Sequence, residues 1–209
     1  MNLPSPRRAR GLERLSGAAP IVRSALAWCL LVGGLAACTP DFNWREIHAD
    51  DDGFRIMMPA RPSTMTRHIN LDGMEVDMTM QMAKVEGMTF AVGSIRLPGA
   101  ETGGQLDELR ARALAAMRGQ MVRNVGGTET EATQVTVKTV DRGGKVVGAQ
   151  AGTQVAADAT STRSGAPPGP RLLARFAGQG PHVIQAVILS PEIDREQAAV
   201  FVDSLQLVQ

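Results

Sequence analysis

Apolar and polar residues alternate along much of the chain after residue 50, and this pattern predicts an antiparallel sheet with one buried face. The clearest example follows the turn Asp72-Gly73, which has the composition of a two-residue hairpin. After this turn, every second position is apolar over Met74, Val76, Met78, Met80 and Met82. We expect a four-stranded meander from residues 54–58, 63–71, 74–82 and 88–97.

Helical spacing replaces the alternation in two segments. In the first, Thr102 and Gln105 have the spacing of a capping box, and a pair of glycines provides a stop. The second begins with Ser190 as the cap and Pro191 at the first helical position. The buried stripes are Leu106, Leu109, Ala113, Met117 and Met121 in the first helix, and Ala198, Phe201, Val202 and Leu205 in the second.

About four more strands separate the two helices, at residues 135–139, 145–157, 171–177 and 182–189. A stretch rich in Ser, Thr, Gly and Pro at residues 158–170 is typical of an exposed loop. The element order is therefore four strands, a helix, about four strands and a helix. An antiparallel sheet with two helices packed on it is an α+β fold, and we expect a single domain over residues 44–209.

The segment before residue 38 has the three parts of a secretory signal. Five arginines form a basic region, and an apolar run follows from Ala25 to Leu35. This run is shorter than the roughly 20 apolar residues that span a bilayer. Residues 1–37 are therefore predicted to be a signal peptide, and residues 38–43 a short tether.

The end of this segment, Leu35-Ala36-Ala37-Cys38, resembles the lipobox of bacterial lipoproteins at all four positions. The resemblance implies that the Cys38 thiol takes a diacylglyceryl group and that a dedicated peptidase cuts before Cys38. Acyl chains such as palmitate would then hold the protein in the bacterial cell envelope, facing the periplasm. An Asp after the cysteine favours the inner membrane in enterobacterial lipoproteins, so Thr39 favours the outer membrane. An ordinary signal peptide or an uncleaved anchor is the alternative.

Loss of the signal peptide changes the composition of the chain. It removes five arginines and one glutamate, so the formal net charge goes from +1 to −3 over the remaining 172 residues. No basic face indicates nucleic acid as a partner. Cys29 leaves with the signal peptide and Cys38 is modified, so we expect no disulfide. Tyr is absent and Trp44 is the one tryptophan left, which disfavours glycan binding on exposed rings.

The two ends of the expected domain are similar to those of PsbP-like domains. The residues that carry the resemblance are Trp44, Gly53-Phe54-Arg55-Ile56 and Pro59 at the start, and Phe201-Val202-Asp203-Ser204-Leu205 at the end. The chain also resembles uncharacterised proteobacterial lipoproteins of similar length. PsbP-like domains are used mainly for accessory and assembly roles. The resemblance therefore implies a fold and a non-enzymatic role rather than a reaction.

Methionines are the unusual side chains of this sequence. Met78, Met80 and Met82 form a Met-x-Met-x-Met run, and thioethers are soft ligands that select Cu(I). A copper site is therefore one hypothesis. The other is that methionine fills a core with few aromatic side chains, and the shared strand face favours this packing role.

Other candidate groups lack the spacing of a known site. The acidic run 50–52 suggests a calcium loop, but His48 and Pro59 stand where an EF-hand needs its first acid and its final Glu. A solvated turn is therefore favoured. His48, His68 and His182 show no ligand spacing, and surface or hydrogen-bonded roles are expected for them. Four arginines off the buried stripe of the first helix offer a surface for an anionic partner, with a solvated helix face as the default: Arg110, Arg112, Arg118 and Arg123.

The sequence thus predicts a non-enzymatic, lipid-anchored envelope protein that needs no cofactor. We expect an accessory or assembly role through contact with another envelope protein, and contact with the membrane through the lipid on Cys38. The alternative is a periplasmic protein that binds copper or a small ligand through Met78, Met80 and Met82.

Overall fold

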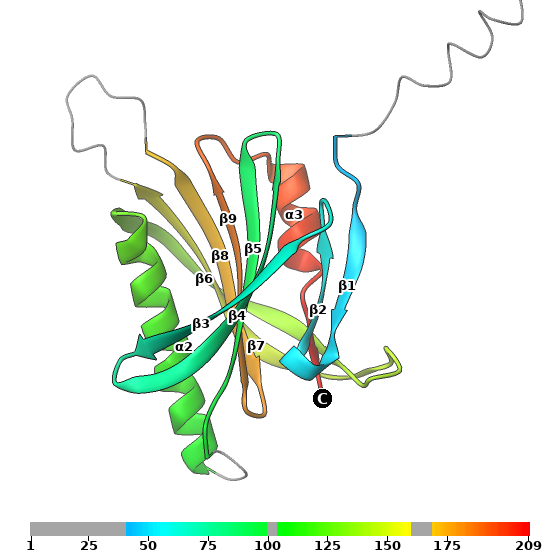
Figure 1. Ribbon diagram of the computed structural model, residues 1–209, viewed down its shortest axis with the longest axis vertical. Coiled ribbons are helices and arrows are strands. Elements are labelled where there is room, and N and C mark those ends of the chain that lie inside the picture. Colours follow the sequence, from blue (N-terminus) through cyan, green and yellow to red (C-terminus); the bar gives the residue numbers. More distant parts are fainter. Residues whose placement is uncertain (1–40, 100–103, 160–168) are drawn as a thin grey trace, which may run out of the picture. The chain divides into compact units, whose positions relative to one another are not determined.

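The computed structural model describes residues 41–99, 104–159 and 169–209, which belong to one compact unit, Asp41–Gln209. These residues form ten strands and two α-helices (Figure 1). The strands are β1 (Arg45–Ala49), β2 (Phe54–Met58), β3 (Ser63–Leu71), β4 (Met74–Val85), β5 (Met88–Arg96), β6 (Gly127–Val140), β7 (Val146–Ala159), β8 (Arg171–Gln179), β9 (His182–Ser190) and β10 (Gln206–Val208). The helices are α2 (Gly104–Asn124) and α3 (Arg195–Asp203), and a 3₁₀ turn, η1 (Asp50–Asp52), joins β1 to β2. The α+β class with two helices is confirmed.

All ten strands belong to one sheet, in the order β1-β2-β10-β6-β7-β8-β9-β5-β4-β3. Neighbouring strands are antiparallel except β10 and β6, which run parallel. β3, β4 and β5 are consecutive as predicted, but the four-stranded meander is wrong because β2 pairs with β1 and β10 instead of β3. The β8–β9 hairpin lies between β7 and β5.

The count of four plus about four strands is wrong because β1 and β10 were not predicted. β1 has charged or polar side chains at Arg45, Glu46 and His48, and it forms one edge of the sheet. β10 is only three residues long and is held between β2 and β6 with Leu207 fully buried. β10 is too short to show an alternation and β1 is mostly polar, so tertiary pairing decides their conformation.

The sheet carries a hydrophobic core on each face. In β9, Val183 lies in one core and the next residue, Ile184, lies in the other. α2 contributes Ala113 and Met117 to the core of Val183, which we call the α2 core. α3 contributes Phe201 to the core of Ile184, the α3 core. The two helices therefore cover opposite faces of the sheet (Figure 1).

The α3 core begins almost at the start of the described chain. The rings of Phe42 and Trp44 stack with centroids 5.9 Å apart, and both meet Phe90 edge to face. Phe90 in turn contacts Phe201 of α3, with ring centroids 5.3 Å apart. The Trp44 indole donates to Gln197 of the same helix at 3.1 Å. The few aromatic side chains of the domain thus lock its first residues onto α3.

The cap of α3 differs from the prediction. Asp194, and not Ser190, is the N-cap, and its carboxylate accepts hydrogen bonds from the backbone N–H groups of Glu196 and Gln197. The Ser190 hydroxyl instead bonds the backbone of Glu192 in the turn before the helix. The helix therefore begins four residues later than the Ser-Pro pair suggested.

Candidate functional site

The lipobox residues Leu35, Ala36, Ala37 and Cys38 lie outside the described residues, so lipid attachment stays a prediction. Residues 41–99, 104–159 and 169–209 contain no helix that is long and apolar enough to cross a membrane.

The methionines predicted to share one face of a strand, Met78, Met80 and Met82, all lie in β4 but differ in their surroundings. Met78 is 8% exposed and packs in the α2 core, where its sulfur accepts a 3.9 Å hydrogen bond from Nε2 of Gln185. Met80 and Met82 are half-buried, and Met80 also packs against the α2 core. Met78 therefore serves packing, as one of the two hypotheses expected.

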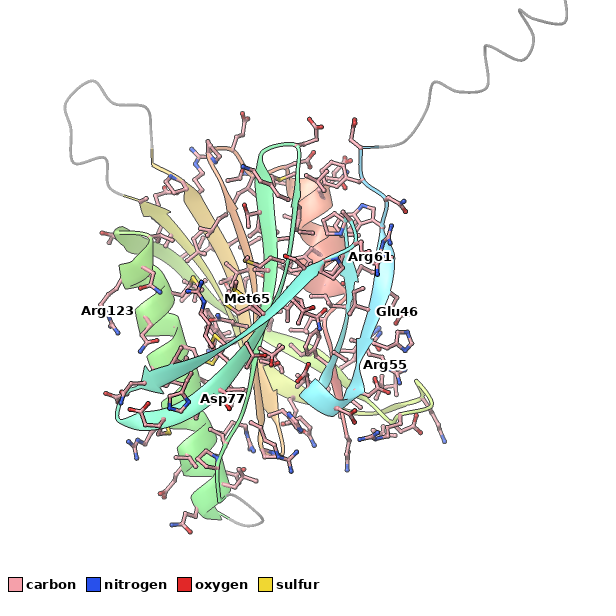
Figure 2. The ribbon with its side chains drawn as sticks, in the orientation of Figure 1. Glu46, Arg55, Arg61, Met65, Asp77 and Arg123 are labelled. Carbon is pink, nitrogen blue, oxygen red and sulfur yellow. The ribbon has the colours of Figure 1, made fainter. Side chains whose placement is uncertain are left out.

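A further methionine lies beside this group. The register of β3 against β4 places Met65 opposite Met80, and Met65 is 37% exposed (Figure 2). Met58, Met88 and Met117 are buried core residues. The accessible thioether of Met65 was not singled out as a ligand from sequence, although the two-residue turn Asp72-Gly73 gives the register that places it opposite Met80.

The four arginines of α2 divide into two pairs. Arg110 donates to the carbonyl of Gly180 at 2.9 Å and forms an ion pair with Asp107. Arg118 forms a two-pronged ion pair with Glu129 of β6. These two side chains hold the helix against the sheet and the turn after β8.

Arg112 and Arg123 make no ion pair with the described residues of the chain. Both are exposed, and both line an open groove of about 530 Å³ between α2 and the tip of the β3–β4 hairpin. Figure 2 shows Arg123 on the outer side of α2. The groove is lined by Asn70, Asp72, Arg112, Ala115, Ala116, Gly119, Gln120 and Arg123.

Small side chains make the floor of this groove. Ala115, Ala116 and Gly119 recur at helical spacing on the face between the two arginines. A Cβ atom at Gly119 would lie 3.0 Å from a guanidinium nitrogen of Arg123, so that charged group folds back over the glycine. Gln120 closes the side of the groove by donating to the carbonyl of Asn70 at 3.1 Å. The result is an open groove with Arg112 toward one end and the Arg123 guanidinium over Gly119 toward the other.

The acidic run of η1 serves as a structural turn. Asp50 accepts two hydrogen bonds from Arg55, at 2.8 and 2.6 Å, and the same guanidinium donates to the carbonyl of Arg142 at 2.6 Å. This pairing lowers the pKa of the Asp50 carboxyl below 3.8. Asp51 pairs with Arg142 at 3.2 Å. The run thus ties β2 to the β6–β7 turn.

His182 is the one half-buried histidine of the domain. Its ring fills the space where a side chain at Gly53 would begin, since a Cβ there would lie 2.5 Å from Cγ of the ring. Its Nε2 lies 3.3 Å from a guanidinium nitrogen of Arg96, and because arginine only donates, Nε2 is the acceptor. Burial and the charge of Arg96 lower the pKa of His182 below 6.5. Burial also raises the pKa of the neighbouring Asp52 carboxyl above 3.8.

The other two histidines are exposed and pair with carboxylates. His48 lies 3.1 Å from Glu46, and His68 lies 2.8 Å from Asp77 and 3.2 Å from Glu75. The hydrogen bond with Asp77 raises the pKa of His68. In the described part of the chain, no three His, Cys, Asp or Glu side chains converge in a way that would hold a metal ion.

No family model and no curated protein matches the sequence. Among solved structures, the chain is similar to the solution structure of cyanobacterial PsbP (CyanoP) from Synechocystis sp. PCC 6803. The two share 13% sequence identity with a TM-score of 0.44, over 84% of this chain and 99% of that chain. A PsbP-like domain is thus a structural neighbour of this fold, and a likeness of this size carries no inference about function.

Proposed function

We propose that this protein is a lipid-anchored, non-enzymatic accessory or assembly factor of the bacterial cell envelope that acts by binding another envelope protein. The Leu35–Cys38 sequence supports attachment through lipid on Cys38, with the domain facing the periplasm and the outer membrane favoured by Thr39. Asp41 follows Cys38 by three residues, which reach at most about 11 Å when extended. The domain would therefore stay close to its membrane.

The groove along α2 is the single observation that carries the binding role. It presents two exposed guanidinium groups beside small side chains of α2, with Asp72 of the β3–β4 turn on its other side. Arginine pairs with carboxylates in a planar, two-pronged geometry. We therefore infer a partner surface that carries carboxylates spaced to reach Arg112 and Arg123.

The surroundings of the titratable groups support a non-enzymatic role. His48 and His68 pair with carboxylates on exposed strands, whereas His182 supports the backbone turn at Gly53. Arg175, which is 7% exposed, binds the carbonyl of Val202 at 2.7 Å. Each of these groups already has a structural contact that accounts for it.

Crosslinking in cells tests the binding role. A photo-crosslinking amino acid at Ala115, on the exposed floor of the groove, should give one defined adduct with an envelope protein. Exposed ion pairs contribute about 0.2–1 kcal/mol each, so replacing both Arg112 and Arg123 by Glu should reduce this adduct roughly tenfold. Lys84→Glu makes the same change of charge at an exposed site on β4 and should leave the adduct intact. No defined adduct, or one that survives the double reversal, would contradict the proposal.

A further inference from the structure

The methionines of the β3–β4 hairpin are not all used for packing. Met78 belongs to the α2 core, and Met80 packs at the margin of that core. Met65 and Met82 belong to neither hydrophobic core: Met65 is 37% exposed and Met82 is half-buried. The hairpin therefore carries partly exposed thioether side chains that the packing of the two cores does not account for.

The strand register brings three of these side chains to one face of the hairpin. Met65 lies directly opposite Met80, and Met82 is the next residue on the same face of β4. Opposed side chains in an antiparallel pair have Cβ atoms about 4.5–5.5 Å apart, and diagonal neighbours such as Met65 and Met82 lie about 7–8 Å apart. Methionine is unbranched and has three rotatable bonds, so the three sulfur atoms can reach one ion. We call Met65, Met80 and Met82 the Met65 cluster.

Met78 lies on the same face but is committed elsewhere. It is 8% exposed in the α2 core, and its sulfur accepts a 3.9 Å hydrogen bond from Gln185. Three methionines at alternate positions of one strand also lie in a line about 13 Å long. Met65 from the neighbouring strand turns this line into a triangle with Met80 and Met82, which is the arrangement that a single ion requires.

The donors of the Met65 cluster determine which ion it could hold. Thioethers are neutral, soft ligands that select Cu(I), whereas Mg²⁺ and Ca²⁺ take oxygen ligands. The facing pairs Ser63–Met82, Met65–Met80 and Arg67–Met78 include no carboxylate. The positive charge of Arg67, next to Met65 on this face, opposes a divalent cation twice as strongly as a monovalent one. The surroundings therefore favour a soft monovalent ion.

We propose that the Met65 cluster binds one Cu(I) ion through the thioether sulfur atoms of Met65, Met80 and Met82. Binding forms three sulfur–copper bonds and changes no oxidation state. The inference stands apart from the lipid anchor and from the α2 groove, because none of the three methionines lines that groove.

Competition against a chromophoric Cu(I) chelator tests the site. The full-length chain carries Cys29→Ser and Cys38→Ser, because thiols would also take the ion, and it is studied in detergent under nitrogen with ascorbate. Loss of a group that only supports a metal ligand weakens binding 10–100-fold, so Met65→Leu should raise the Cu(I) dissociation constant by roughly tenfold or more. Leucine at this exposed position should leave the fold intact.

Met57→Leu is the matched control. Met57 is a half-buried methionine of β2 that belongs to neither core, so the same substitution there should leave the Cu(I) dissociation constant unchanged. The proposal is overturned if Met65→Leu has no effect on that constant, or if Met57→Leu raises it as much.

Methyl NMR on isotope-labelled methionine identifies the ligands without relying on affinity. Cu(I) at one equivalent should shift the methyl signals of Met65, Met80 and Met82, because their sulfur atoms bind the ion. The signals of Met58 and Met117, which are buried in the α3 core and the α2 core, should stay in place. A shift at Met78 in place of Met65, or no shift at any of the three, would contradict the proposal.

Discussion

At the scale of single residues, His182 and Gly53 form one structural unit. The backbone at Gly53 has φ of +84°, a conformation that side chains with a Cβ rarely adopt, and the imidazole occupies the space that a Cβ would need. Arg96 donates to this ring from β5. This contact favours the neutral ring, because a proton on Nε2 would face the guanidinium.

This arrangement predicts a pH-dependent stability. The folded pKa of His182 lies below 6.5, so the unfolded chain binds the proton more tightly and the free energy of unfolding falls as the pH drops. His182→Gln should therefore flatten the loss of stability between about pH 7.5 and about pH 5.5. Urea unfolding at several pH values measures this slope.

His68 is the matched control for that series. Its pKa is raised by Asp77 and Glu75, so its contribution is present at low pH and is lost as the pH rises, which is the opposite sign. His68→Gln should leave the slope unchanged or make it slightly steeper. A His182→Gln variant with the slope of the unaltered protein would show that the ring is protonated without cost in the fold.

Residue roles were only partly predictable from sequence. The interpretation of Met78 as core followed from strand alternation, because that pattern alone identifies the buried face. The contact between Gly53 and His182 spans 129 positions of the chain and depends on the tertiary fold. In the sequence, the one sign of this contact is the position of Gly53 directly after the acidic run 50–52.

At the scale of elements, α2 continues through Gly119, where helix propensity is lowest. The space next to this glycine holds the Arg123 guanidinium, and the far end of an exposed arginine moves at little cost. Gly119 keeps the groove floor flat. Only the movable side chain of Arg123 lies close to the position that a Cβ would take, so packing does not require a glycine here.

Gly119→Ala should raise the free energy of unfolding by about 0.5–1 kcal/mol, because alanine favours the helix and Arg123 can swing away. Urea denaturation measures the change. Gly152→Ala is the contrasting variant, since its Cβ would lie 2.9 Å from the backbone oxygen of Phe176, and it should destabilise the domain. Destabilisation by Gly119→Ala would mean that the Arg123 guanidinium cannot move away from position 119.

The helices and the longer strands were predictable from their periodicity, whereas the strand order was not. Hairpins such as β3–β4 and β8–β9 follow from local turns. The insertion of β8–β9 between β7 and β5 depends on which apolar faces meet in the two cores, and a single sequence does not encode that in any local pattern.

At the scale of the whole molecule, the α2 groove is the surface that would offer two arginines to an acidic partner. Arg45 and the β6–β7 turn lie at opposite ends of the sheet. Arg45 pairs with Met58 at the end of β2. The start of β2, at Phe54, lies across β10 from Val140, where the β6–β7 turn begins.

Lipid attachment at Cys38 is the central claim of this account, and metabolic labelling with radioactive palmitate tests it most directly. The full-length protein should incorporate the label, and Cys38→Ala should abolish it. Cys29→Ala should retain it, because cleavage before Cys38 would remove Cys29 with the signal peptide. An unlabelled protein, or a Cys38→Ala variant that still carries the label, would contradict the account.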